Sequence, residues 1–228
     1  MKLLVNPSPE KWKKQLARPV QKTKEINKIV KPIFEKVEKN GDKALKKFAQ
    51  EYDHVSLDSL LVTPEEIKAA KDQISKELKE AIKTAKANIE RFHAAQATPE
   101  LIEEVMPGVV CRRKSVPIQR VGLYIPGGTA PLFSTVLMLG VPAKIAGCKE
   151  VVLCTPPNRE GKIHPAILYT ADLVGITKIV KVGGAQAVAA LTFGTESVPQ
   201  VDKIFGPGNQ YVTAAKQFAT KYGVAIDM

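Results

Sequence analysis

Residues 120–128, Arg-Val-Gly-Leu-Tyr-Ile-Pro-Gly-Gly, join a short apolar run to a glycine turn, and this pairing decides the fold. The first turn is Pro126-Gly127-Gly128-Thr129, and comparable turns recur at Gly183-Gly184-Ala185-Gln186 and at Gly206-Pro207-Gly208-Asn209. In a parallel α/β sheet, such turns all lie at the carboxyl edge of the strands, where ligands bind. The sequence therefore predicts an α/β domain with a small-molecule site at that edge.

On both sides of these turns, strand-like and helix-like segments alternate as far as residue 228. Short runs rich in β-branched residues predict strands at 121–125, 151–154, 179–182, 203–205 and 224–226. Helical stretches lie between them at about 133–147, 164–174, 185–193 and 208–222. This alternation predicts a parallel sheet with helices on both faces and right-handed connections.

The first hundred residues are typical of helices. Apolar side chains recur at helical spacing over residues 20–37, and Asn40-Gly41 is a helix stop. Pro32 lies inside this stretch, so we expect it to kink or divide the helix. A capping box at Thr63-Pro64-Glu65-Glu66 predicts a second helix that continues to about Ala97. Strand-like residues follow over 108–119.

The composition excludes several classes of protein. The chain has 228 residues, of which 44% are hydrophobic and 25% charged, as in globular proteins. No apolar run is long enough to span a membrane, and no secretory leader opens the chain. Cys111, Cys148 and Cys154 are an odd number without CxxC spacing, which indicates neither a disulfide framework nor a thiolate zinc site. We therefore expect a cytoplasmic protein that does not bind membranes.

The net charge of +11 raises the question of nucleic-acid binding. Residues 1–120 hold 25 Lys and Arg against 17 Asp and Glu, a net charge of +8. These cations alternate with glutamates at three- and four-residue spacing, as in Lys31 and Glu35, which is typical of a solvated helix face. Interleaved aromatic residues and a recognised motif are missing, so we expect no nucleic-acid partner.

The glycine turns do not form a standard nucleotide motif. Gly206-Pro207-Gly208 matches only the first half of GxGxxG, because Tyr211 stands where a third small residue belongs. No acidic residue ends the second strand, at Cys154-Thr155-Pro156-Pro157, to hold a ribose hydroxyl. A GxxxxGK[ST] phosphate loop is also missing. A nucleotide site at this edge would therefore differ from the usual one.

Three polar residues beside the turns are the candidates for the lining of the site: Tyr124, Gln186 and Asn209. Tyr124 could stack on a base or simply pack in the core. The amide of Gln186, in the first turn of its helix, can both donate and accept hydrogen bonds. Asn209 stands at a helix start, where an asparagine is often only an N-cap. Each has a structural alternative, and their convergence on one edge favours ligand binding.

Catalytic and metal-binding patterns are missing from residues 1–228. His54, His93 and His164 are far apart, and none has a second histidine at the helical spacing of a metal site. No Ser/His/Asp set or local pair of carboxylates stands out. We therefore assign no catalytic residue and no metal ligand within this chain.

The second half closely resembles the histidinol dehydrogenases. The matching blocks are residues 120–128, 134–138, 181–187, 190–191, 193–199, 201–209 and 225–228. The resemblance implies oxidation of L-histidinol to L-histidine through the aldehyde L-histidinal, with NAD and zinc, in a cytoplasmic homodimer. It also implies that Tyr124, Gln186 and Asn209 bind NAD, the same residues that the turns indicate.

The resemblance implies three regions in this chain, and it places NAD binding and catalysis in different parts of the enzyme. Residues 1–20 correspond to an arm helix, 21–119 to the first half of an outer α/β domain, and 120–228 to an inserted Rossmann-like NAD-binding domain. The family's zinc ligands and catalytic Glu-His pair follow residue 228. We therefore expect residues 1–228 to carry the NAD-binding part only, to be inactive alone, and to expose apolar surface around residues 64–119. The alternative is a non-catalytic nucleotide-binding or regulatory module derived from that enzyme.

Overall fold

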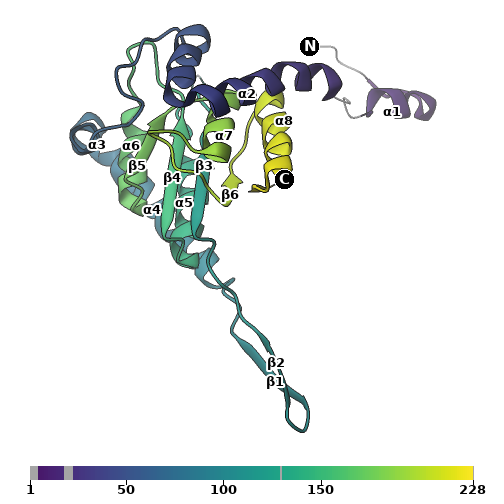
Figure 1. The fold of residues 1–228 in the computed structure, drawn as a ribbon. Helices are drawn as coiled ribbons and strands as arrows, with labels where there is room; N and C mark the ends of the chain where they lie inside the picture. The colour runs from purple at the N-terminus through teal and green to yellow at the C-terminus, as the bar shows by residue number, and fades with distance from the viewer. Residues whose placement is uncertain (1–4, 18–22, 129, 228) are drawn as a thin grey trace.

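The computed structural model describes residues 5–17, 23–128 and 130–227. Residues 1–4, 18–22, Thr129 of the first glycine turn and Met228 lie outside the described residues, and they include parts of the predicted arm region over residues 1–20. Within that region, α1 (Pro9–Gln15) is a short helix set apart from the rest of the molecule (Figure 1).

Five parallel strands form the centre of the molecule (Figure 1). Across the sheet they are β5 (Lys178–Lys181), β4 (Glu150–Thr155), β3 (Arg120–Tyr124), β6 (Lys203–Phe205) and β7 (Ala225–Ile226). Each neighbouring pair is parallel. All five strands predicted for this sheet are present, with each end within one residue of its expected position, and the predicted α/β class is confirmed.

Helices cover both faces of the sheet in two layers each. One face carries α5 (Phe133–Ala146) and α6 (Pro165–Val174), with α3 (Pro64–Ala70) and α4 (Lys76–Ala94) packed outside them. The other face carries α7 (Gly184–Phe193) and α8 (Gln210–Ala219), continued by the 3-10 turn η3 (Thr220–Tyr222), with α2 (Thr23–Phe48) outside them. Successive strand residues alternate between the two faces, so Leu153 lies in the first core and Cys154 in the second.

Helix α2 is interrupted at Gly41 and not at Pro32. Gly41 has φ 49° and ψ −131°, as expected for the predicted stop at Asn40-Gly41, whereas the backbone stays helical through Pro32. Pro32 was expected to kink or divide the helix, and the division is wrong. Val30 and Phe34, on either side of the proline, are fully buried against the helices below, and this packing holds the helix together despite the missing hydrogen bond.

The predicted helix from Thr63 to Ala97 is two helices. The capping box forms as expected, with Thr63 Oγ1 accepting from Glu66 N–H and Glu66 accepting from Thr63 N–H. However, α3 ends in the 3-10 turn η2 (Lys71–Gln73), and Ile74 is extended. The Ser75 hydroxyl then caps α4 by accepting from Leu78 N–H. The prediction of one continuous helix is therefore wrong, because Ser75 starts a new helix within the stretch.

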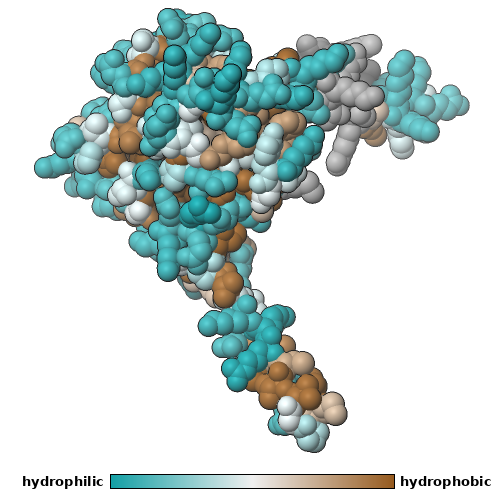
Figure 2. All heavy atoms as spheres, viewed as in Figure 1, coloured by the Kyte–Doolittle hydropathy of each residue, from teal (hydrophilic) through white to brown (hydrophobic). Residues whose placement is uncertain are grey.

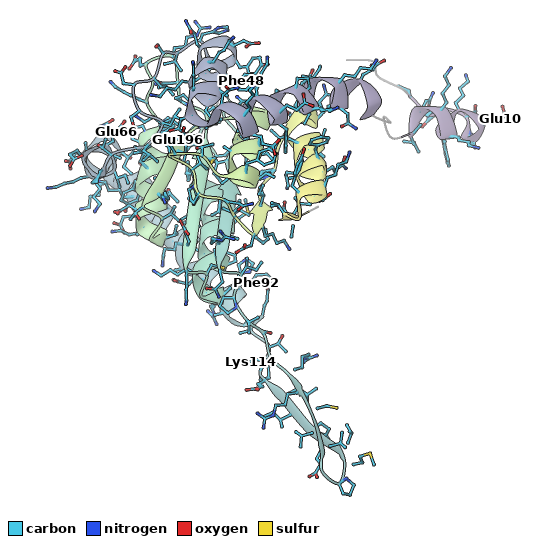
Figure 3. All side chains as sticks on the ribbon, viewed as in Figure 1. Glu10, Phe48, Glu66, Phe92, Lys114 and Glu196 are labelled. Atoms are coloured by element: carbon cyan, nitrogen blue, oxygen red, sulfur yellow. The ribbon has the colours of Figure 1, made fainter. Side chains whose placement is uncertain are left out.

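A hairpin projects away from the body of the molecule (Figure 1). It pairs β1 (Leu101–Met106) with β2 (Val109–Arg113), so the predicted strand over 108–119 stops at Arg113, and its partner was not predicted. All residues of both strands are exposed, and Figure 2 shows an apolar patch on the hairpin. In Figure 3, Lys114 lies where the hairpin joins the body. Apolar exposure in the predicted 64–119 region is thus concentrated on this hairpin.

Two further backbone hydrogen bonds join the segment before α3 to the edge strand β5. Residues 60–62 pair antiparallel with the outer edge of β5, where Val62 N–H donates to Ile179 O and Lys181 N–H donates to Leu60 O. This pairing satisfies backbone groups on an otherwise open edge.

Among the described residues, no helix combines the length and the apolar character that crossing a lipid bilayer requires.

Candidate functional site

The site lies at the point where the strand order reverses. After β3 the chain continues to β4 and β5 on one side, and it returns to β6 on the other side of β3. Ligands of open α/β sheets bind in the crevice outside the carboxyl ends of the strands at such a point. A cavity of about 1100 Å³ opens here, and we call it the switch-point cavity.

The switch-point cavity draws its walls from both halves of the sequence. The sheet contributes the loops after β3, β4, β5 and β6, and the amino-terminal helices contribute a further side. The residues that line it include Ile29, Ile33, Tyr52, Asp53, Tyr124, Pro126, Gly127, Gly128, Pro156, Pro157, Glu160, Lys162, His164, Gly184, Gln186, Asn209 and Tyr211. The three predicted binding residues are therefore brought together in one cavity.

Tyr124 ends β3 and is 4% exposed. Its hydroxyl oxygen accepts a hydrogen bond of 3.1 Å from Gly184 N–H, at the start of α7. Burial raises the pKa of this phenol to about 12, so the hydroxyl keeps its proton at any physiological pH. No described residue accepts that proton in a hydrogen bond, which leaves the hydroxyl able to donate to a ligand.

Gly206 allows β3 and β6 to meet closely at this edge. Its φ is 127°, and a Cβ there would overlap the carbonyl oxygen of Tyr124. A side chain at residue 206 would therefore push the end of β6 away from the end of β3, and only glycine fits.

Gln186 is buried, with 3% of its surface exposed, in the first turn of α7. Its side chain folds back over Gly184, where a Cβ would lie 2.6 Å from Gln186 Oε1. Gly184 has φ 63°, a left-handed conformation in which a side chain would be strained, so the backbone favours glycine there. The Gln186 amide is thus held beside the Tyr124–Gly184 hydrogen bond at the inner wall of the cavity.

Asn209 combines the two roles that the sequence left open. Its Oδ1 accepts from Tyr211 N–H at 3.0 Å and from Val212 N–H at 3.1 Å, so it is the N-cap of α8. Both hydrogen bonds use the oxygen, and no described residue bonds to the Nδ2 group. The cap therefore orients the side chain and leaves two N–H donors at the rim of the cavity.

Sequence reasoning missed the residues that the amino-terminal half contributes. Asp53 is the last residue of the π-helix η1 (Ala49–Asp53), which continues α2. Burial raises the pKa of its carboxyl group to about 6, an effect that His54 partly opposes. Asp53 lies some seventy residues before the glycine turns, so no local pattern connects it with them.

His164 lies at the same cavity but already has a structural role. It was expected to be a neighbour of a helix N-cap, and it is the N-cap of α6 itself, with Nδ1 accepting from Ala166 N–H at 3.1 Å. The described residues contain no group of three His, Cys, Asp or Glu side chains that could hold a metal ion.

Comparison with known proteins decides the family. A family model described as histidinol dehydrogenase matches residues 16–228. This chain belongs to the histidinol dehydrogenase family. Histidinol dehydrogenase from Bacteroides thetaiotaomicron is 58% identical over 228 residues, which are 100% of this chain and 53% of that protein. The histidine biosynthesis trifunctional protein of Kluyveromyces lactis is 50% identical over 220 residues, covering 94% of this chain and 28% of that protein.

A solved histidinol dehydrogenase has the same fold. The crystal structure of the enzyme from Elizabethkingia anophelis matches with a TM-score of 0.92 and 54% identity, over 98% of this chain and 52% of that one. The chain thus spans about half the length of the histidinol dehydrogenases that it matches. These matches confirm the resemblance found in the sequence blocks, whereas the ligand roles of Tyr124, Gln186 and Asn209 stay predictions.

Proposed function

We propose that this chain binds NAD in the switch-point cavity and carries the cofactor-binding part of an enzyme that oxidises L-histidinol to L-histidine through L-histidinal. The observation that supports it best is the meeting of Tyr124, Gln186 and Asn209 in one cavity at the reversal of the strand order. Family membership supports the reaction, which belongs to the last steps of histidine biosynthesis.

The residues of the cavity fit a dinucleotide in size and polarity. About 1100 Å³ is at the upper end of small-ligand sites, as an extended dinucleotide requires. The N-termini of α7 and α8 both open there and present N–H groups that suit an anionic diphosphate. Tyr124 and Asn209 would donate hydrogen bonds, and Gln186 would donate or accept. When bound, NAD accepts the hydride that leaves the substrate carbon.

The other parts of the reaction belong to the whole enzyme. In the described part of the chain, no group of three His, Cys, Asp or Glu side chains could hold a metal ion. The zinc, the catalytic base and the homodimer that the family implies remain predictions about the full-length enzyme. The division into an outer region (21–119) and an NAD-binding region (120–228), and the cytoplasmic location, are proposed on the same basis. The switch-point cavity, however, is built from both regions.

Two measurements on the purified chain test the proposal. Calorimetric titration should detect NAD⁺ binding, and Gln186→Ala should weaken it about tenfold because a buried amide partner is lost. A chain that does not bind NAD⁺ contradicts the proposal. With L-histidinol, NAD⁺ and zinc supplied, we expect no NADH; its formation would show that residues 1–228 carry the catalytic groups after all.

A further inference from the structure

The carboxylate of Asp53 is unexplained by the contacts within the protein. Oδ2 of Asp53 is a buried side-chain oxygen without a hydrogen-bond partner, the one such atom found among the described residues. Asp53 is nevertheless one of the residues that line the switch-point cavity. Buried polar atoms are nearly always bonded, so an orphan at a cavity points to a partner that arrives with a ligand.

The backbone holds Asp53 firmly in this position. His54, the next residue, is left-handed with φ 56°, a conformation that non-glycine residues seldom adopt. Val55 N–H donates to Ala49 O across the end of η1 and closes the turn around Asp53. Ala49 and Val55 are buried in the core below α2. The carboxylate is therefore presented by a fixed turn.

Among the described residues that line the cavity, no cation pairs with this carboxylate. The other titratable groups that line the cavity are Tyr52, Tyr124, Glu160, Lys162, His164 and Tyr211. Lys162 pairs with Glu160 at 3.4 Å, and His164 caps α6. Tyr124 is near enough for the charge of Asp53 to help raise its pKa, but the described residues show no hydrogen bond between the two side chains, and the Tyr124 oxygen accepts from Gly184 N–H.

We propose that Asp53 accepts hydrogen bonds from the neighbouring hydroxyls of a ribose of bound NAD. This inference rests on the proposed function, because it assigns one contact of the same ligand. Dinucleotide folds usually take this contact from a carboxylate after the second strand. Here β4 ends at Thr155 and two prolines, so the chain has no acid at that place. Asp53 supplies it from the amino-terminal helices.

The surroundings of Asp53 suit a nucleoside. Tyr52, immediately before it, lines the cavity with 46% of its surface exposed, and Ile29 of α2 lines it with 48% exposed. These side chains form an apolar wall against which a planar base can lie, and the ribose bonded to that base would reach Asp53. The two oxygens of a carboxylate match the two adjacent hydroxyls of a ribose.

The negative charge of Asp53 makes it informative whether Asp53→Asn strengthens or weakens NAD⁺ binding. NAD carries a diphosphate, so a carboxylate that made no hydrogen bond to it would only repel it, and Asp53→Asn would strengthen binding. If Asp53 accepts from a ribose, the same substitution should weaken NAD⁺ binding about tenfold to hundredfold, since hydrogen bonds to charged groups are the strong ones.

The test compares Asp53→Asn with Asp58→Asn by titration with NAD⁺ from pH 5 to pH 8. Asp58 is an exposed carboxylate five residues further on and does not line the cavity, so the control makes the same charge change. For the unchanged chain and the control, affinity should rise with pH as Asp53 ionises around pH 6. Asp53→Asn should bind weakly and lack this rise, while His54 and His164 remain in place.

The remaining outcomes of these titrations contradict the inference. Unchanged or stronger binding by Asp53→Asn, beside weaker binding by Gln186→Ala, refutes the role of Asp53 and leaves the proposed function standing. No binding by the unchanged chain refutes both. A final probe is nicotinamide hypoxanthine dinucleotide, which lacks the amino group of adenine. If Asp53→Asn loses affinity for NAD⁺ but not for this analogue, Asp53 recognises the base and the ribose assignment is wrong.

Discussion

The buried Lys216 and the partly buried Asp227 form an ion pair that fixes the turn after β6 from both sides. Lys216 Nζ donates to Asp227 Oδ1 and to Gly206 O, while Asp227 Oδ2 accepts from Gly206 N–H at 2.9 Å. Both backbone polar groups of Gly206 are thus satisfied by this one pair. Because Gly206 also touches Tyr124, the pair supports the floor of the switch-point cavity.

Asp227→Asn is expected to lower the free energy of unfolding by about 2–3 kcal/mol, because it leaves the Lys216 charge buried without its counter-ion. Urea denaturation followed by circular dichroism measures this loss. Asp172→Asn is a suitable control, because Asp172 is about as exposed as Asp227 but its partner Lys71 is 52% exposed, whereas Lys216 is 9% exposed. The Lys71–Asp172 pair should therefore contribute under about 1 kcal/mol. Equal effects of the two substitutions would contradict the structural importance of the Lys216–Asp227 pair.

Tyr124→Phe should weaken NAD⁺ binding about tenfold, since the hydroxyl that can donate to the ligand is removed and Gly184 N–H loses its acceptor. Calorimetric titration at pH 8 measures the affinity. Tyr169→Phe is the matched control, because Tyr169 is also buried but lies in the core between α6 and its neighbours, outside the cavity. A similar loss in both variants would indicate a general packing effect.

Substitutions of Asn209 can separate its cap from its ligand role. Asn209→Asp keeps the capping oxygen and should retain the stability of α8, but it removes the N–H donors and should weaken NAD⁺ binding about tenfold. Asn209→Ala should lower stability by about 1 kcal/mol through loss of the cap. Thermal unfolding and NAD⁺ titration of both variants provide the comparison. If Asn209→Asp binds NAD⁺ normally, Asn209 is an N-cap only.

Gly206→Ala should destabilise the chain by at least about 3 kcal/mol, because the added Cβ meets the Tyr124 carbonyl and the φ of 127° disfavours a side chain. Gly108→Ala is the control: Gly108 also has a positive φ, of 84°, but a Cβ there contacts nothing within 4 Å. Its cost should be limited to backbone strain of about 1–2 kcal/mol. Chemical denaturation of the two variants checks the difference.

Asp53 should make stability depend on pH in the opposite direction to most carboxylates. Its folded pKa of about 6 lies above the ordinary value of 3.8, so between these values the folded chain holds a proton that the unfolded chain has released. Stability is therefore expected to fall as pH rises from about 4 to about 6. Asp53→Asn should lack this fall and be more stable than the unchanged chain at pH 7. Thermal unfolding across this range, with Asp58→Asn as control, measures it.

The sheet could be predicted because its signals are local. β-Branched runs, glycine turns and cap residues act within a few positions of each other, and they placed the strands and the edge that carries Tyr124, Gln186 and Asn209. Some of the features missed depend on contacts between segments, whereas the Ser75 cap that separates α3 from α4 is local. The packing of α2 holds the helix together through Pro32, and Leu101–Met106 becomes a strand only by pairing with the next segment. Asp53 joins the cavity only because α2 lies across α7.

The position of α2 has a consequence for motion in the cavity. Ile33 of α2 is buried in the same core as α7 and also lines the cavity, so one wall of the site belongs to a packed helix and not to a flexible loop. Opening that wall would require part of α2 to leave its core. Amide hydrogens of α2, although far in sequence from the glycine turns, should therefore exchange with solvent more slowly once a ligand occupies the cavity.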